Sequence, residues 1–396
     1  MDITIQPRPL QGDITVIPSK SQAHRLLICA AFADAPTILE CPETNRDMDA
    51  TAGCLTALGA DIVKTETGYY IAPANRIPEK AELNVHDSGS TLRFMLPVAG
   101  ALGVDTVFRM EGRLPQRPLS PMWEEMERMG CTLTRPSADT IRCTGMLRPG
   151  HYRIDGSVSS QYITGLLLAL SLMDSPSQLE ITGRVESKPY IQMTKDAISL
   201  FGGSTEHPGA RRFHSPGKLT VEGDWSNGAF FLAANTLGSC LDIHGLKMDS
   251  SQGDRAAAEL LPKLRSEMSV IDAGDIPDLV PILSVVAACC QGAEFTNIRR
   301  LRLKESDRVA SVIAMIRALG GKAEADENTL RILGTGLTGG TVDSVNDHRI
   351  AMSAAVAATA CKASVTILGA ECVKKSYPKF FEEYRRLGGN YEQYLR

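Results

Sequence analysis

The sequence has no apolar run long enough to cross a membrane. Its longest apolar stretches, such as ITGLLLALSLM, fall well short of the roughly 20 residues that a bilayer requires. The first twenty residues also lack the basic segment and apolar run of a secretory signal. We therefore expect a cytoplasmic protein with no membrane partner.

An excess of positive charge is also missing. The chain has 396 residues and a formal net charge of −4, with 43% hydrophobic and 22% charged residues. This composition is ordinary for a globular protein. A net negative chain has no general attraction for nucleic acids, so we expect no nucleic-acid partner. If the ligand is an anion, local clusters of Arg and Lys must attract it.

No group of cysteine and histidine residues has the spacing of a zinc site. The ten cysteines are scattered, and several of them, including Cys29, Cys54, Cys289, Cys290 and Cys361, lie in apolar helical patterns. This placement is typical of buried thiols in a reducing compartment. The sequence therefore predicts no metal site.

The most informative feature that is present is a repeat. A polar opening followed by a helix rich in small apolar residues occurs six times, beginning at Ser19, Asp87, Ser157, Asp224, Asp275 and Asn346. These helices are apolar nearly all round, so each should be buried. Ser, Asp and Asn in the openings suit helix N-caps. An amphipathic helix follows in each repeat, and then strand-like segments.

The two ends of the chain complement each other. The last repeat lacks its strands, whereas the N-terminal segments MDITIQP and GDITVIP have no helix before them. We expect the N-terminus to supply the missing strands of the last repeat. Three repeats per domain then give a discontinuous domain of residues 1–18 and 225–396, and a second domain of residues 19–224.

The helix openings also predict a ligand class. Free N–H groups and the helix dipole both favour negative charge at a helix N-terminus. The openings add the cations Lys20, Arg25, Arg93 and Arg349, and an arginine can bind phosphate or carboxylate through two hydrogen bonds. The pattern predicts a polyanionic small molecule bound between two domains.

Taken in order, the openings resemble the 3-phosphoshikimate 1-carboxyvinyltransferase (EPSP synthase) family. The motifs that carry the resemblance are PSKS, SGST, QRP, SVSSQ, SKPYI, EGDWSNGAFFLAA, IPDLVP, LKESDR and NDHR, and they cover nearly the whole chain. The resemblance implies an α/β fold, a two-domain inside-out α/β barrel. Each domain would have three βαβαββ repeats with buried helices, and the active site would lie in the cleft between them. We expect a monomer.

The implied reaction moves the enolpyruvyl group of phosphoenolpyruvate (PEP) to the 5-hydroxyl of shikimate 3-phosphate and releases phosphate, without a cofactor. By resemblance, Asp278 accepts the hydroxyl proton, while Glu305 or Lys20 protonates C3 of PEP. The residues implied to bind shikimate 3-phosphate are Lys20, Ser21, Arg25, Ser159, Ser160, Gln161, Ser187, Tyr190, Asp278 and Lys304. Those implied to bind PEP are Lys20, Gly89, Arg117, Gln161, Arg308, Arg349 and Lys375.

Several of these residues also have a purely structural interpretation. In LKESDRV, Lys304 with Asp307 and Glu305 with Arg308 are three residues apart, and such pairs stabilise a helix by roughly 0.2–0.5 kcal/mol each. Asp278 could be the N-cap of the apolar helix that follows it. By resemblance, Asp347 would orient Arg349.

Two other functions are alternatives to this interpretation, and one residue departs from the pattern of the family. UDP-N-acetylglucosamine enolpyruvyl transferases share the fold, but they have a reactive cysteine five residues before the arginine that corresponds to Arg117, where this chain has Gly112. A non-catalytic repeat scaffold that binds anions would need the cations but not Asp278 and Glu305. Arg300 stands where many members of the family have asparagine, which puts the contact with shikimate at this position in doubt.

Overall fold

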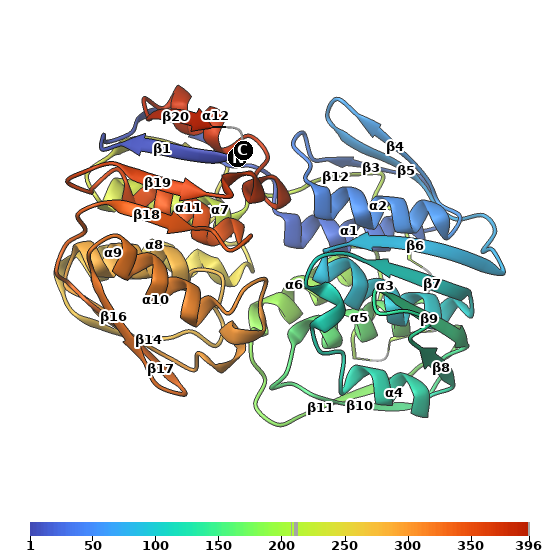
Figure 1. The fold of residues 1–396 in the computed structure, drawn as a ribbon. Helices are drawn as coiled ribbons and strands as arrows, with labels where there is room; N and C mark the ends of the chain where they lie inside the picture. Colours follow the sequence, from blue (N-terminus) through green and yellow to red (C-terminus); the bar gives the residue numbers. More distant parts are fainter. Residues whose placement is uncertain (207, 210–212, 395–396) are drawn as a thin grey trace. The chain divides into compact units, whose positions relative to one another are not determined.

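The computed structural model describes residues 1–206, 208–209 and 213–394. The chain folds into two compact units, drawn in Figure 1. Unit 1 consists of Met1–Ile17 and Gly223–Arg396, and unit 2 consists of Pro18–Glu222. Unit 1 is therefore built from both ends of the chain, and unit 2 from the stretch between them.

Unit 2 is built around the helices α1 (Lys20–Ala31), α3 (Gly89–Leu102) and α5 (Ser160–Ser171), which are buried on nearly every side. Helices α2 (Arg46–Ala57), α4 (Met122–Arg128) and α6 (Lys188–Leu200) bury one face each. At Gly165 a β-carbon would lie 2.1 Å from the backbone oxygen of Arg93. The glycine in the apolar run of α5 thus lets α5 pack directly against α3.

The strands of unit 2 form two four-stranded sheets and one parallel pair. One sheet has the order β12 (Lys218–Thr220), β3 (Thr37–Glu40), β5 (Gly68–Ala72), β4 (Asp61–Thr65). The other has the order β6 (Lys80–His86), β7 (Asp105–Met110), β9 (Thr140–Gly145), β8 (Cys131–Thr134). The pair consists of β10 (His151–Asp155) and β11 (Gln178–Thr182).

Unit 1 repeats this plan. Its buried helices are α7 (Trp225–Thr236), α9 (Val280–Cys289) and α11 (His348–Ala357), and α8 (Ala257–Ser266), α10 (Arg308–Ala318) and α12 (Phe380–Arg386) bury one face each. Its sheets have the orders β18 (Gly340–Asp343), β19 (Val365–Leu368), β1 (Asp2–Gln6), β20 (Asn390–Tyr394), and β14 (Ser269–Asp272), β15 (Ala293–Thr296), β17 (Thr329–Leu333), β16 (Lys322–Ala325). The parallel pair is β13 (Cys240–His244) with β2 (Gln11–Thr15).

The expectation for the N-terminus is right for one strand and wrong for the other. β1 lies between β19 and β20 and completes the sheet of the last repeat. β2 instead pairs with β13, the strand that follows α7. The strand before α7, β12, in turn pairs with β3, the strand after α1. The strands before α1 and α7 are thus exchanged between the two repeats, which is why the chain passes twice between the units.

Short 3₁₀ helices lie next to the longer elements: η1 (Leu114–Gln116), η2 (Gly253–Ala256), η3 (Arg299–Leu303) and η4 (Ala370–Lys375). The expected N-caps are present at Ser19, Ser88, Ser159, Asp224 and Asp347, whose side chains accept a backbone N–H of the helix that follows. The exception is α9, whose N-cap residue is Leu279 and has no side-chain bond. The interpretation of Asp278 as an N-cap is therefore wrong.

The predicted fold class, an α/β fold with repeated units around buried helices, is confirmed. Of the helices described, none is both long and apolar enough to span a membrane. The expectation of buried cysteines holds for Cys29, Cys54 and Cys361, whereas Cys289 and Cys290 are partly exposed.

Candidate active site

The carboxylate of Asp278 lies among three cationic side chains in unit 1. Its Oδ1 atom lies 2.5 Å from Nη1 of Arg308 and 3.5 Å from Nζ of Lys304, and its Oδ2 atom accepts a hydrogen bond of 3.2 Å from Nη2 of Arg349. Burial would raise the pKa of Asp278, but Arg349, Lys304 and Arg308 outweigh it and hold that pKa well below its usual range. Asp278 is therefore an anion in this structure.

Arg308 is the most deeply buried cation of this cluster, with 1% of its side chain exposed. Its Nε atom donates to Asp347 at 3.0 Å and its Nη2 atom to Glu305 at 2.8 Å, in addition to the contact with Asp278. Burial works against the charged guanidinium, yet Asp347, Glu305 and Asp278 raise the pKa of Arg308 well above its ordinary value. A buried charge needs such partners, because an uncompensated one is very costly.

The local fold around LKESDR differs from the purely structural interpretation of its sequence. Helix α10 begins at Arg308, with Asp307 as its N-cap accepting the N–H of Ala310 at 3.1 Å. Lys304 and Glu305 therefore precede the helix, and Lys304 pairs with Asp278 instead of Asp307. The predicted pair of Glu305 with Arg308 does form. Because the chain turns before the helix starts, all these charges except that of Asp307 face one cluster.

Asp347 contacts both Arg349, its expected partner, and Arg308. Its Oδ1 atom caps α11 through the backbone N–H of Arg349, while its Oδ2 atom accepts from Arg308 and from Ser306 at 2.9 Å. It thus orients the Arg308 guanidinium and anchors the start of α11. Val345 and Asn346, directly before it, have φ values of +46° and +57°. Such strain in residues other than glycine is often found at functional sites.

Lys304 is the cation of the cluster with the weakest hold on its proton. Burial lowers the pKa of Lys304 to about 8, with Asp278 and Glu305 acting in the opposite direction and Arg308 and Arg300 adding to the decrease. Arg300 is therefore close enough to Lys304 to repel its charge. The departure at position 300 adds a second positive charge beside a residue that the resemblance assigns to shikimate 3-phosphate.

In unit 2, Lys20 is held by a carboxylate that the sequence analysis passed over. Nζ of Lys20 lies 3.0 Å from Oδ2 of Asp47, and the side chains are only 15% and 5% exposed. Lys20 is the first residue of α1 and Asp47 lies in the first turn of α2. The signal that the sequence offered for Asp47 was an acidic residue in the first turn of the helix after α1.

Arg25 is buried and joins three segments of unit 2 through hydrogen bonds. Its guanidinium donates to Oγ1 of Thr194 at 2.8 Å, to the backbone oxygen of Ser21 at 2.5 Å and to the backbone oxygen of Tyr190 at 2.9 Å. Burial lowers the pKa of Arg25 to about 10. It therefore ties together Ser21 and Tyr190, two residues that the resemblance assigns to the same ligand.

The remaining residues predicted in unit 2 lie at helix openings. Ser159 is the N-cap of α5, the buried Ser160 is its first residue, and the side-chain amide of Gln161 donates to Ser90 Oγ at 2.9 Å in the opening of α3. Ser187 precedes α6 with a φ of +53° and 2% exposure. The structure thus places the openings of α3 and α5 in contact.

Gly89 opens α3 against two guanidinium groups. A β-carbon at this position would lie 2.6 Å from Nη1 of Arg117 and 2.6 Å from Nη1 of Arg93. Arg93 is buried and donates to the backbone oxygens of Gly89 at 3.3 Å and Pro118 at 3.1 Å. A glycine lets both cations approach the N-terminus of α3, which concentrates positive charge there.

Lys375 ends η4 in unit 1, next to the opening of α7. Its neighbour Ser376 accepts a hydrogen bond of 3.3 Å from the side-chain amide of Asn227, which lies in the first turn of α7. This contact fixes the backbone beside Lys375 to the core of unit 1. A further buried carboxyl in this region, Asp254, was not predicted from the sequence.

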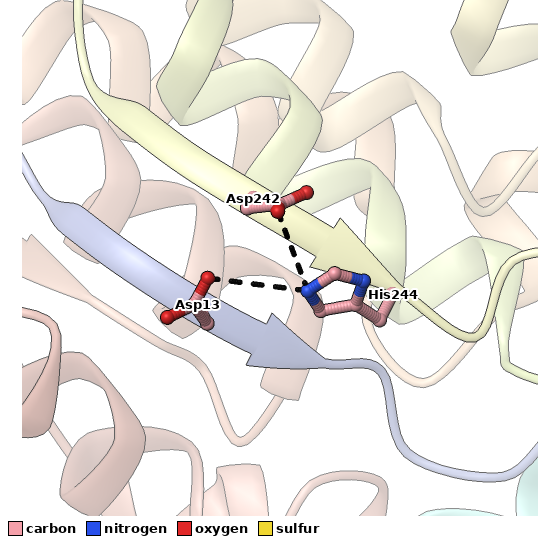
Figure 2. Close-up of side chains that lie close together, drawn as sticks. All are labelled: Asp13, Asp242 and His244. Carbon is pink, nitrogen blue, oxygen red and sulfur yellow. Dashed lines mark ion pairs between the residues drawn. The ribbon is translucent and has the colours of Figure 1, made fainter.

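A separate group of titratable side chains lies on the parallel pair β2 and β13. Figure 2 shows Asp13, Asp242 and His244 converging on one another. Nε2 of His244 lies 3.5 Å from Asp242 and 4.0 Å from Asp13, and Asp13 pairs with Asp242 in the strand register. All three are exposed. The histidine lies between two carboxylates that would otherwise face each other, so we interpret the group as a surface ion-pair cluster.

The fold is that of the enolpyruvyl transferases. Superposition gives a TM-score of 0.80 with an EPSP synthase from Acinetobacter baumannii, at 22% identity over 99% of this chain and 100% of that chain. The enolpyruvyl transferase NikO from Streptomyces tendae gives 0.75, at 18% identity over 99% and 98% of the two chains.

Sequence comparison narrows the class to one family. The family model described as EPSP synthase (3-phosphoshikimate 1-carboxyvinyltransferase) matches residues 5–384. Relatives named 3-phosphoshikimate 1-carboxyvinyltransferase include those of Clostridium kluyveri, 36% identical over 99% of this chain and 98% of the relative, and Clostridium beijerinckii, 34% identical over 99% of each. The chain belongs to the EPSP synthase family.

Proposed function

We infer that this protein transfers the enolpyruvyl group of PEP to the 5-hydroxyl of shikimate 3-phosphate. The products are 5-enolpyruvylshikimate 3-phosphate and phosphate. The observation that carries the inference, beside family membership, is the cluster of Asp278 with Lys304, Arg308 and Arg349. It combines a proton acceptor with cations for two highly charged anions, which is what this chemistry requires.

In the addition step, the 5-hydroxyl oxygen attacks C2 of PEP and its proton passes to Asp278. A carboxylate held by three cations is a weak base, so its basicity must rise when the substrates bind. The phosphate and carboxylate groups of the substrates supply that change, because they compete for Arg308, Arg349 and Lys304. A cation that binds a substrate anion no longer has to bind Asp278, and the basicity of that carboxylate then rises.

C3 of PEP gains a proton in the same step, and the tetrahedral intermediate later loses phosphate while C3 gives a proton back. Glu305 is our proposed group for these transfers. Its Oε2 atom accepts from Arg308 in this structure, and its side chain is 20% exposed. A substrate anion on Arg308 would release the carboxyl group for proton transfer. Lys20, held by Asp47, is the second candidate.

Binding is divided between the units. We assign shikimate 3-phosphate to Lys20, Ser21, Arg25, Ser159, Ser160, Gln161, Ser187 and Tyr190 of unit 2, and to Asp278 and Lys304 of unit 1. We assign PEP to Lys20, Gly89, Arg117 and Gln161 of unit 2, and to Arg308, Arg349 and Lys375 of unit 1. The cleft between the units, the monomeric state and the cytoplasmic location stay predictions.

The backbone at Gly112 supports this acceptor over UDP-N-acetylglucosamine. Gly112 has a φ of +57°, a conformation that side chains other than glycine adopt at a cost. It occupies the position where the rival family has its reactive cysteine. The backbone of a cysteine at this position would be strained, so the conformation of the loop favours glycine.

The test of the mechanism is Glu305→Gln. Glutamine retains an oxygen that accepts from Arg308 but cannot transfer a proton as a carboxyl group does, so we expect kcat to fall by roughly 10²–10⁴-fold. The affinity for shikimate 3-phosphate, measured by calorimetry, should change less than about threefold, or about 0.6 kcal/mol. The control is Glu294→Gln, which removes a partly exposed partner of Arg331. Undiminished turnover in Glu305→Gln would remove Glu305 from the mechanism.

A further inference from the structure

The backbone oxygen of Pro118 anchors the loop that carries Arg117. It accepts a hydrogen bond of 2.5 Å from Oη of Tyr162 and one of 3.1 Å from Nη2 of Arg93. A proline also restricts the residue before it to extended conformations, and Arg117 has a φ of −76° and a ψ of 138°. The contacts of Pro118 therefore fix the backbone from which the Arg117 side chain extends.

Tyr162 lies in the core of unit 2. It belongs to the first turn of α5, is 1% exposed, and α5 packs against α3. Burial raises the pKa of Tyr162, although Arg93 and Arg117 act in the opposite direction. The hydroxyl therefore keeps its proton and can donate to Pro118. The ring also lies near the guanidinium of Arg93, 5.8 Å from the ring centroid, a distance at which a cation and an aromatic ring attract each other.

The Arg117 guanidinium lies beside a second cation at the opening of α3. A β-carbon on Gly89 would lie 2.6 Å from Nη1 of Arg117 and 2.6 Å from Nη1 of Arg93. Like charges this close repel each other, so in the absence of an anionic ligand Arg117 needs a restraint. We propose that Tyr162 is this restraint, a positioning residue that holds the Arg117 loop, and with it the guanidinium, in the geometry that binds PEP. The inference rests on the proposed function, in which Arg117 binds PEP, and Tyr162 acts through Arg117.

The variant that tests the inference is Tyr162→Phe, which removes the hydroxyl and keeps the ring. Its matched control is Tyr152→Phe. Tyr152 on β10 is also fully buried, and its hydroxyl donates to the backbone oxygen of Arg148 at 2.8 Å. Each variant loses one buried hydrogen bond to a carbonyl oxygen, so urea unfolding should show a similar loss of stability in both. A purely structural role of Tyr162 therefore predicts the same kinetics for the two variants.

Steady-state kinetics with PEP and shikimate 3-phosphate separates the two roles. In Tyr162→Phe we expect the KM for PEP to rise about fivefold, because a loop that is less well ordered before binding lowers the affinity for its ligand. The KM for shikimate 3-phosphate and kcat should change less than about twofold, since the lost restraint affects PEP binding in the ground state and the transition state alike. Tyr152→Phe should follow the parent.

Hydrogen exchange tests the restraint without substrates. Backbone amides between residues 113 and 120 should exchange faster in Tyr162→Phe than in the parent, and at the parent's rate in Tyr152→Phe. A double variant tests whether Tyr162 acts through Arg117. In the Arg117→Gln background, Tyr162→Phe should not raise the KM for PEP further, because no guanidinium remains to be positioned.

Three results would overturn the inference: an unchanged KM for PEP in Tyr162→Phe, an equal rise of the KM for shikimate 3-phosphate, or unchanged exchange of the loop. A parent protein inactive with PEP and shikimate 3-phosphate would instead overturn the proposed function. The exchange rates would then still decide whether Tyr162 holds the loop.

Discussion

At the scale of single residues, the site is a balance of buried charges. Arg308 has carboxylate partners from three places in unit 1: Asp278 before α9, Glu305 before α10 and Asp347 before α11. These carboxylates lower the cost of burying the Arg308 charge, because a buried ion is stable only when it is paired. In the proposed mechanism, a substrate anion that enters this cluster replaces a carboxylate partner and so changes the proton affinity of the displaced group. The same contacts that stabilise the substrate-free site thus prepare it for acid–base chemistry.

The close contacts at Gly89 lead to a prediction about the KM for PEP. In Gly89→Ala the new β-carbon would lie 2.6 Å from Nη1 of both Arg93 and Arg117, so these flexible guanidiniums must move. We expect the KM for PEP to rise about tenfold, which corresponds to about 1.4 kcal/mol, with little change for shikimate 3-phosphate. Steady-state kinetics measures both.

The matched control for Gly89→Ala is Gly53→Ala in α2, where a β-carbon would meet no atom within 4 Å. Alanine favours a helix over glycine by about 1 kcal/mol, so this variant should be slightly more stable and kinetically unchanged. An unaltered KM for PEP in Gly89→Ala would contradict the placement of PEP beside Arg117.

At the scale of elements, a chain of buried polar side chains links the helices α1, α2 and α3 of unit 2. Nδ1 of His24 on α1 lies 2.7 Å from Oγ1 of Thr51 on α2, which lies 2.8 Å from Oγ1 of Thr91 on α3. Thr91 donates to the N-cap Ser88 at 2.8 Å. Burial lowers the pKa of His24 to about 3, with Lys20 and Arg25 adding to the decrease and Asp47 opposing it.

This histidine predicts an acid sensitivity of folding. The folded state keeps His24 neutral down to about pH 3, whereas the unfolded chain protonates it near pH 6.5. Its contribution to stability is therefore complete above pH 6.5 and is lost as the pH falls toward 3, by at most about 1.4 kcal/mol per pH unit. His24→Gln removes this titration.

Urea unfolding at pH 6.5 and pH 4.5 measures the effect. His24→Gln should lose less stability over this interval than the parent, while His151→Gln, an exposed histidine, should behave like the parent. Equal losses in the parent and His24→Gln would show that His24 does not remain neutral.

The elements differ in whether the sequence predicts them. The buried helices, their capped openings and the antiparallel pairs such as β4 with β5 and β16 with β17 could be predicted, because each depends on neighbours within one repeat. The pairing of β2 with β13 could not, since it joins strands more than 200 residues apart. The start of α10 was missed because Lys304 and Glu305 bind Asp278 and Arg308 instead of extending the helix.

The residues of the candidate site likewise differ in whether the sequence predicts them. Family motifs predict Lys20, Asp278 and Glu305 as site residues, but their partners depend on the fold. Asp47 was passed over because an acidic residue in the first turn of a helix is common, and its importance follows from its burial beside Lys20. Residues that act through another residue have few local signals, so sequence analysis finds them last.

At the scale of the whole molecule, the assignment of one ligand to both units predicts a movement. Shikimate 3-phosphate has proposed contacts in unit 2 and in unit 1, so we expect the units to close on it. Small-angle scattering should show a smaller radius of gyration with saturating shikimate 3-phosphate than without it. Shikimate without the phosphate group is the control ligand. An unchanged radius would contradict a site shared between the units.

The central claim is that this protein joins PEP to shikimate 3-phosphate, and phosphate release tests it most directly. The purified protein is supplied with PEP and either shikimate 3-phosphate or UDP-N-acetylglucosamine, and free phosphate is followed over time. We predict release that depends on shikimate 3-phosphate and is absent with the sugar nucleotide. Release with only the sugar nucleotide, or with neither acceptor, would contradict the account.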